Sequence, residues 1–254
     1  MPTPISEAVG CTTGGGEEFS PLVRYPGATV RVPLQYFGSV GYYAVLSRFG
    51  RVEVDTCMRF DKRFKSAHRC VVADTRGLLR LTVPVEHGAS GGTWAETRVS
   101  THAEWWQLQH TALESAYGRT PYFEFYIDRL LPLFEPRHEG SCETVAELCA
   151  AADCAVRELA GIDARVACAH ESAGMAGELV GAVDLRRYDF GLVTVPEYYQ
   201  IRADRLGFFP GLSILDLLFN LGPESALVLR DCRVEVSVPA GAAAAQGGGE
   251  RPRV

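Results

Sequence analysis

Residues 28–57 read ATVRVPLQYFGSVGYYAVLSRFGRVEVDTC, and their periodicity predicts how the chain folds. The beginning of this stretch alternates apolar and polar side chains, a pattern typical of a β-strand. Its middle places apolar side chains at helical spacing and stops at Gly50, a residue suited to a helix C-cap. Its end, RVEVDTC, returns to strand alternation and predicts a strand that ends on Asp55. A strand–helix–strand unit is the element from which parallel sheets are built.

A β-hairpin and three helices are predicted next. RCVVADTRGLLRLTVPVEHG (69–88) contains two strand-like segments around the turn D-T-R-G, in which Gly77 can supply a positive φ. The helices are predicted for AEWWQLQHTALESAYG, PYFEFYIDRLLPLF and CETVAELCAAADCAVRELAGI. Thr101 and Glu104 have the spacing of a capping box before the first of these helices.

The remainder of the chain is less regular. Residues 162–200 are ambiguous and contain candidate strands at ARVACA and GLVTVP. GLSILDLLFNLGP begins with a second capping-box pattern, Ser213 and Asp216, and stops at Gly222, so it predicts a further helix. The order of the elements predicts an α/β (or α+β) fold. We expect a βαβ unit and a hairpin to form a mixed sheet, packed with a helical middle and C-terminal region.

We expect one domain with flexible ends. A chain of 254 residues is long enough to bury a sizeable core. Residues 1–27 are rich in Gly, Thr, Pro and Ser, and residues 237–254 form an Ala/Gly-rich tail. Compositions of this kind are typical of poorly ordered termini, so the single domain is expected to span 28–236.

The composition argues against several classes of protein. A formal net charge of −6 disfavours a general nucleic-acid binder, whose phosphate contacts need a broad basic surface. The N-terminus lacks the pattern of a signal peptide, and no uncharged apolar run approaches the ~18 residues of a membrane span. The eight cysteines include no C-x-x-C pair, which favours free thiols in a reducing cytosol over a zinc site. We therefore expect a cytoplasmic protein without a membrane span, metal or cofactor.

A basic stretch, RFDKRFKSAHRC (59–70), follows the second predicted strand. It contains Lys62 and Lys65, the only two lysines of a chain that otherwise uses arginine. Open α/β sheets bind ligands beyond the carboxyl ends of their strands. Lys62, Arg63, Lys65 and Arg69 are therefore candidate ligands of a phosphate or carboxylate. The alternative is a solvated rim of the hairpin, which is the commoner role of a charge run, and the sequence leaves both interpretations open.

Three histidines and one tryptophan complete the candidate site. His68 could act as a general base near neutral pH, and His87 could reach the same edge of the sheet as a substrate contact. Trp106, His110 and Glu114 share one helix face, where a His–Glu pair can make a positioned base and Trp106 can contact substrate. The catalytic candidates are thus His68 and His110. The alternative for each is a structural or surface role, because aromatic residues at helical spacing usually belong to the core.

Four stretches together resemble the WbqC-like family of bacterial proteins: RFDKRFKSAHR, LTVPVEH, EWWQLQHTALESAYGRTPYFEFY and YYQIRADRLGFFPGLSILDLLFNLGP. They span about residues 36–230. In the family's terms, Lys62, Arg63, His68 and Arg69 correspond to a basic block usually written K-x-x-x-x-N-R, with His68 where asparagine is common. The aromatic-proline turn often found after the family's first strand is replaced here by QYFGSVGYY. The resemblance implies a role in surface-polysaccharide (O-antigen) biosynthesis, with glycyl transfer onto an amino sugar as the proposed reaction.

Two principal functions remain in competition. The first is a transferase that acylates an amino sugar, with a phosphorylated or nucleotide-linked sugar as its partner. The second is a non-catalytic protein of the same pathway that binds an anionic sugar-phosphate intermediate or a partner, and the lack of a recognisable nucleophile–base pair favours it. A third, less favoured function is contact with the end of an aminoacyl-tRNA. The oligomeric state is not predicted.

Overall fold

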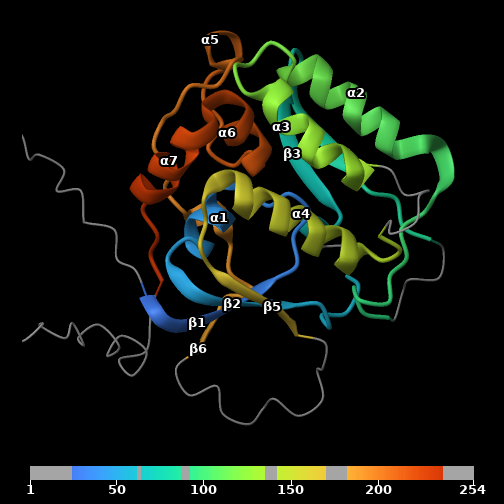
Figure 1. The fold of residues 1–254 in the computed structure, drawn as a ribbon, viewed down its shortest axis with the longest axis vertical. Helices are drawn as coiled ribbons and strands as arrows, with labels where there is room; N and C mark the ends of the chain where they lie inside the picture. Colours follow the sequence, from blue (N-terminus) through green and yellow to red (C-terminus); the bar gives the residue numbers. More distant parts are fainter. Residues whose placement is uncertain (1–24, 62–63, 87–91, 135–141, 170–181, 237–254) are drawn as a thin grey trace, which may run out of the picture.

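The structure is a computed structural model, and it places helices on one side of a four-stranded sheet (Figure 1). It describes residues 25–61, 64–86, 92–134, 142–169 and 182–236. Residues 1–24 and 237–254, which make up most of the predicted flexible ends, lie outside the described residues. None of the helices within the described ranges has both the length and the apolar character needed to cross a membrane.

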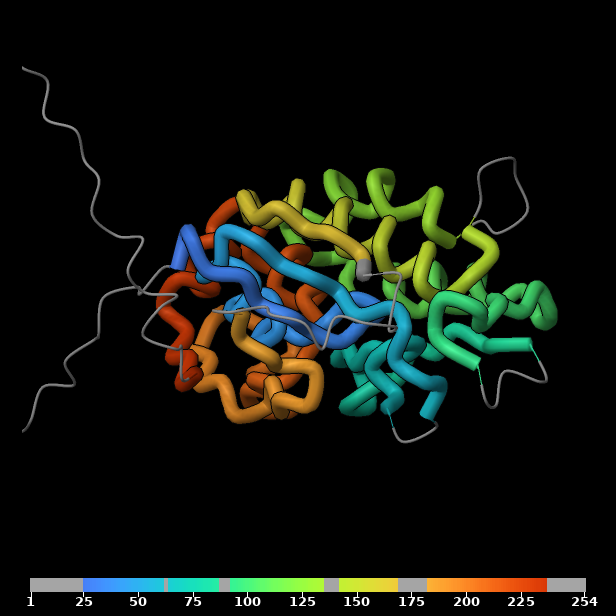
Figure 2. The backbone as a smooth tube through the Cα atoms, turned by 90° about the horizontal axis from the view of Figure 1, so that it is seen from below, coloured from blue at the N-terminus to red at the C-terminus, as the bar shows by residue number. Residues whose placement is uncertain are grey.

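All four strands of the larger sheet run parallel (Figure 2). In spatial order they are β5 (Arg165–Ala169), β2 (Phe49–Asp55), β1 (Tyr25–Pro33) and β6 (Ala182–Asp184). Val30 pairs with Val52 and Val32 with Val54, and all four side chains are buried. These valines give the sheet an apolar face toward the helices, whereas Arg31 and Glu53 pair with each other on the opposite face at 3.0 Å.

The predicted βαβ unit is confirmed, with α1 (Val40–Leu46) connecting β1 to β2. The helix ends earlier than expected, because Ser47 is its C-cap and Gly50 already lies within β2. The pairing of β2 with β1 starts at Phe49, opposite Tyr25, so the strand includes the glycine that was predicted to end the helix. The predicted end of β2 at Asp55 is confirmed.

The predicted hairpin forms a sheet of its own. Its strands β3 (Arg69–Asp74) and β4 (Gly77–Thr82) are antiparallel, and Gly77 makes the turn at φ 124°. The hairpin does not join the parallel strands, because the backbone of β3 finds other partners. Val71 O accepts a hydrogen bond from Ser213 N, and Ala73 N donates to the Tyr117 hydroxyl. An α/β fold is confirmed, with two sheets where one mixed sheet was expected.

The remaining helices pack around this hairpin and above the parallel sheet (Figure 1). They are α2 (Trp105–Tyr117), α3 (Phe123–Leu130), α4 (Val145–Ala160), α5 (Ala203–Leu206), α6 (Ile214–Leu221) and α7 (Ser225–Asp231). Short 3-10 turns are η1 (Lys65–Ala67), η2 (His102–Glu104), η3 (Leu131–Phe134), η4 (Phe190–Leu192) and η5 (Gly222–Glu224). The α4 helix is defined by local signals at both ends, with a capping box between Thr144 and Glu147 and a left-handed Gly161 as C-cap.

Neither of the two predicted capping boxes forms. Thr101 makes no side-chain cap, and Glu104 adopts a left-handed conformation at φ 43° before α2 begins. Ser213 does cap α6, but its hydroxyl accepts from Leu215 N and the carboxyl of Asp216 turns into the core. In the ambiguous region, ARVACA forms β5 as predicted, whereas GLVTVP forms part of η4 and an extended segment with one bridge at Thr194.

Candidate anion-binding site

A cavity of about 420 Å³ lies beyond the carboxyl ends of β1 and β6. Four segments form its wall: the loop after β1, η1 with the start of β3, the segment after β6, and the residues before α6. We name it the outer cavity and define it by its polar lining residues Gln35, Ser39, Lys65, Ser66, Arg69, Tyr188, Asp189 and Ser213. Its position is the one at which open parallel sheets bind ligands.

Two positive charges line the outer cavity without an acidic partner. Lys65 is the exposed first residue of η1, and Arg69 is the half-buried first residue of β3. The Arg69 Nε donates to Thr82 Oγ1 at 2.8 Å, which fixes the guanidinium, and its other N–H groups have no partner among the described residues. No carboxylate of the described residues pairs with either side chain. A compact ammonium and a guanidinium fork on one wall can bind a phosphate or a carboxylate.

One carboxylate also lines the outer cavity. Asp189 caps η4, and its Oδ1 accepts from Gly191 N at 2.9 Å. It is the only acidic side chain among the described lining residues. Next to it, the ring of Tyr188 packs against Phe190 with centroids 5.2 Å apart, which holds this segment in place. The cavity therefore combines cations that suit an anion with an acceptor that suits a hydroxyl or amine.

Next to the outer cavity, the guanidinium of Arg186 is already paired with two carboxylates of the protein. Arg186 bridges the ends of two strands, with Nη1 2.9 Å from Asp55 Oδ2 and Nη2 2.6 Å from Asp184 Oδ2. The hydrogen bonds to Asp184 raise the pKa of Arg186, and Arg186 in turn lowers the pKa of Asp184. Both carboxylates compete with any external anion, so Arg186 stabilises the edge of the sheet rather than offering a binding group.

His68 lies on a different side of the chain from the outer cavity. Its imidazole stacks on Trp94 at 5.5 Å and lies 6.5 Å from Phe60. Burial, followed by the charges of Arg69 and Lys65, lowers the pKa of His68, so the ring is neutral at pH 7. Its buried Nδ1 has no hydrogen-bond partner in the described part of the chain. The structure thus brings Lys65 and Arg69 to the outer cavity and leaves His68 outside its lining.

The candidates on α2 are also outside the outer cavity. Trp106 is buried, and its ring meets Trp105 edge-on at 6.0 Å, so its described contacts are those of a core residue. His110 is half-buried one turn further along the helix and does not line the outer cavity. The helix contacts the loop after β1 through Gln109, whose Oε1 accepts from the Tyr36 hydroxyl at 2.8 Å.

Three predicted substrate contacts, Lys62, Arg63 and His87, lie outside the described residues. Sequence reasoning missed two others, Gln35 and Asp189. Gln35 lies just beyond the end of β1, with only Leu34 between them, so the rule that ligands bind beyond strand ends could have found it. Asp189 lies in the ambiguous region 162–200 and carries no such signal.

A family model described as "WbqC-like protein family" matches residues 35–188. The chain belongs to the WbqC-like protein family. The match starts at Gln35 and ends at Tyr188, both of which line the outer cavity, and it includes Lys65 and Arg69. The stretch LSILDLLFNLGP, on which the resemblance to WbqC-like proteins also rests, lies beyond the matched residues. No curated protein and no solved structure matches this chain.

Proposed function

We propose that this WbqC-like protein binds a phosphorylated or nucleotide-linked sugar in the outer cavity. One observation carries the proposal: Lys65 and Arg69 line the same cavity, and no described acidic residue neutralises either charge. A volume of about 420 Å³ also falls within the range of about 300–1,000 Å³ that is typical of small-molecule sites. The phosphate binds to the two cations, and the sugar lies toward the other walls.

Direct binding measurements test this proposal. Isothermal titration with inorganic phosphate, pyrophosphate and nucleotide sugars is expected to show binding to the wild type. Lys65→Ala and Arg69→Ala are each expected to weaken it about tenfold, because each removes one charge-assisted contact. Arg76→Ala is the matched control, since Arg76 is an exposed arginine of the same hairpin that does not line the outer cavity. Equal affinities in all three variants would exclude the outer cavity as the phosphate site.

Acyl transfer, such as glycyl transfer, to an amino sugar in surface-polysaccharide biosynthesis is the second candidate function. The observation that favours it is Asp189, a carboxylate on the wall of a cavity that also holds two cations. When the amine nitrogen forms a bond to the acyl carbon, the bond from that carbon to the donor's activating group breaks, and a base must accept the proton that the amine loses. A carboxylate within reach can do so. His68 and His110 do not line the outer cavity, so Asp189 replaces them as the proposed base.

The transferase function is tested by incubating the protein with nucleotide amino sugars and activated glycine. The expected product is heavier by one glycyl unit. Asp189→Asn is expected to abolish product formation while phosphate still binds, because asparagine keeps the acceptor for Gly191 N and loses the basic carboxylate. His110→Ala is expected to leave product formation unchanged. Phosphate binding without product across the panel would favour the non-catalytic binding protein.

A further inference from the structure

One face of the β3–β4 hairpin continues the wall of the outer cavity. Arg69 pairs with Thr82 and Val71 with Arg80, and opposite residues of an antiparallel pair project from the same face. The side chains between them in sequence are buried on the other face of the hairpin: Cys70, Val72 and Leu81. Arg69 and Val71 line the outer cavity, whereas Arg80 does not. Because Arg80 lies opposite Val71, it stands just beyond the point at which the cavity wall ends.

The hydrogen bond from Arg69 to Thr82 directs the Arg69 guanidinium toward β4. Its Nε donates across the hairpin to Thr82 Oγ1 at 2.8 Å. Thr82 and Arg80 are two residues apart on the same face of β4, so their Cα atoms are about 7 Å apart. Long side chains reach across a separation of this size. The guanidinium groups of Arg69 and Arg80 can therefore contact one and the same ligand.

Arg80 is an exposed cation without a counter-ion in the described part of the chain. The hairpin contains a single acid, Asp74, which lies at the turn, where its Oδ1 accepts from Arg76 N at 2.7 Å. Lys65, Arg69 and Arg80 thus form a row of three positive charges. Like charges repel one another, and a bound anion relieves the repulsion. A ligand with two linked phosphate groups can contact the whole row, whereas a single phosphate lies only on the two cations of the outer cavity.

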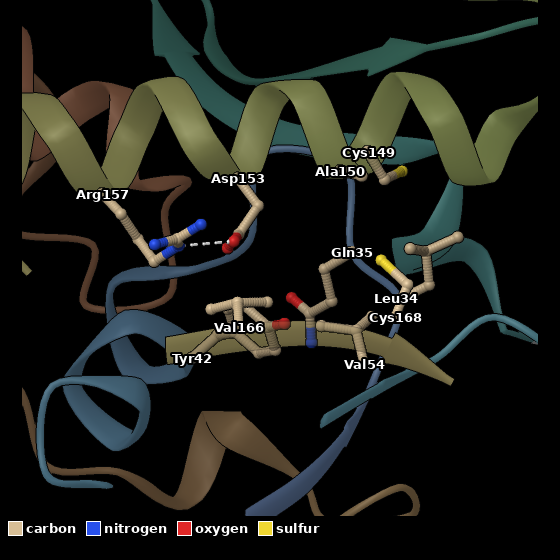
Figure 3. A pocket seen from close by; sticks show the side chains of 10 residues that line it. All are labelled: Leu34, Gln35, Tyr42, Val54, Cys149, Ala150, Asp153, Arg157, Val166 and Cys168. Atoms are coloured by element: carbon tan, nitrogen blue, oxygen red, sulfur yellow. Dashed lines mark hydrogen bonds and ion pairs between the residues drawn. The ribbon is translucent and has the colours of Figure 1, made fainter. Parts of the chain in front are cut away.

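The other cavity that borders the loop after β1 offers no comparable site. It lies under α4 and has a volume of about 130 Å³ (Figure 3). The charged residues of its described wall are Asp153 and Arg157, and the dashed line in Figure 3 joins them. Asp153 Oδ2 accepts from Arg157 Nε at 2.7 Å, so an external anion would compete with a carboxylate already in place. A second phosphate therefore finds an available cation along the hairpin and not under α4.

We infer that Arg80 binds the second phosphate of a diphosphate-linked sugar whose first phosphate, next to the sugar, lies on Lys65 and Arg69. This inference rests on the proposed function and narrows its ligand from any phosphorylated sugar to a sugar joined to a diphosphate, as in a nucleoside diphosphate sugar. It also gives the ligand a direction. The sugar lies in the outer cavity, and the group beyond the second phosphate lies over the exposed face of the hairpin.

The test compares ligands that have one phosphate group with ligands that have two. Isothermal titration of the full chain uses two pairs of ligands, phosphate with pyrophosphate and glucose 1-phosphate with UDP-glucose. In the wild type, the diphosphate of each pair is expected to bind at least about tenfold more tightly, because it gains a charge-assisted contact. Arg80→Ala is expected to weaken diphosphate binding about tenfold and to change monophosphate binding by less than about twofold. Arg80 is exposed, so this variant is expected to fold.

Arg76→Ala is the matched control, because it removes the same charge from the turn of the same hairpin and is expected to keep all four affinities. Equal loss of diphosphate binding in the two variants would show a general effect of charge and overturn the inference. Diphosphates that bind no more tightly than monophosphates in the wild type would also overturn it. A preference for UDP-glucose without one for pyrophosphate would do so as well, since the nucleoside would then be the recognised group.

These results leave the proposed function standing as long as phosphate binding is weaker in Lys65→Ala and Arg69→Ala. If the wild type binds none of the four ligands, the proposed function fails, and the inference that rests on it fails with it.

Discussion

Asp216 is a carboxylic acid in the core, and its titration should be visible in the stability of the protein. It is 1% exposed, and the hydroxyls of Tyr117 and Tyr198 donate to its two oxygens at 2.9 and 2.7 Å. No described cation pairs with it. Burial therefore raises the pKa of Asp216 to about 6 from a usual value of 3.8, against the lowering effect of the two hydroxyls.

The sign of the effect follows from which state binds the proton. Between pH 4 and pH 6 the folded protein keeps the proton of Asp216, whereas the unfolded chain releases it. Folding is therefore favoured at the acidic end of this window, and the free energy of unfolding falls as the pH rises. With pKa values of about 6 and 3.8, the loss between pH 4 and pH 7 is about 2–3 kcal/mol.

Urea unfolding of the wild type and Asp216→Asn at pH 4, 5, 6 and 7 measures this loss. Other groups, including Asp153, whose pKa burial also raises, contribute equally to both proteins and cancel in the difference. The difference between the two free energies is expected to change by about 2–3 kcal/mol across the series. Tyr198→Phe removes one hydrogen-bond donor and should shift the transition to higher pH. Parallel curves for wild type and Asp216→Asn would refute the assignment of a raised pKa to Asp216.

Three further predictions concern stability, each measured by urea unfolding at pH 7. Arg48→Met should cost about 3 kcal/mol, because the buried guanidinium donates to the carbonyls of Ala44, Leu229, Arg230 and Cys232, and an unchanged midpoint would contradict this. Thr144→Ala should cost about 1 kcal/mol through loss of the α4 cap, with a Thr144→Ser control near wild type. Gly38→Ala should cost about 1–3 kcal/mol, since the added Cβ would lie 2.7 Å from the Tyr42 ring; wild-type stability would show that the ring can move aside.

The sequence predicted those elements whose signals are local. Residues 28–57 show strand alternation, then helical spacing, then strand alternation again. The observed β1–α1–β2 unit has its elements in the same order. The α4 helix carries a cap at each end, Thr144 and Gly161, and the helix predicted for this stretch is confirmed. Where the deciding contact comes from a distant part of the chain, the local pattern was not sufficient. Asp216 fits a capping box, but the hydroxyls of Tyr117 and Tyr198 hold it in the core instead.

In the candidate site, too, the sequence predicts what depends on local signals and misses what depends on contacts between distant segments. The position of the basic stretch after β2 predicted that Lys65 and Arg69 would lie near the edge of the sheet, and both line the outer cavity. It could not indicate that His68, the residue before Arg69, would stack on Trp94, because that contact comes from a segment distant in the sequence. Gln35 and Asp189 reach the outer cavity from segments far apart in sequence, and no spacing rule connects them.

The parallel sheet has a consequence for how the protein reaches its folded state. The β1–α1–β2 unit can form from neighbouring residues, but Thr29 completes its pairing only with Ala182, far along the chain. Non-local parallel pairing is slow to form, because loop-closure entropy is lost before the contacts are gained. The outer cavity needs segments from Gln35 to Ser213, so its wall is assembled after the first unit has folded. Ligand binding should therefore return with the slowest phase of refolding.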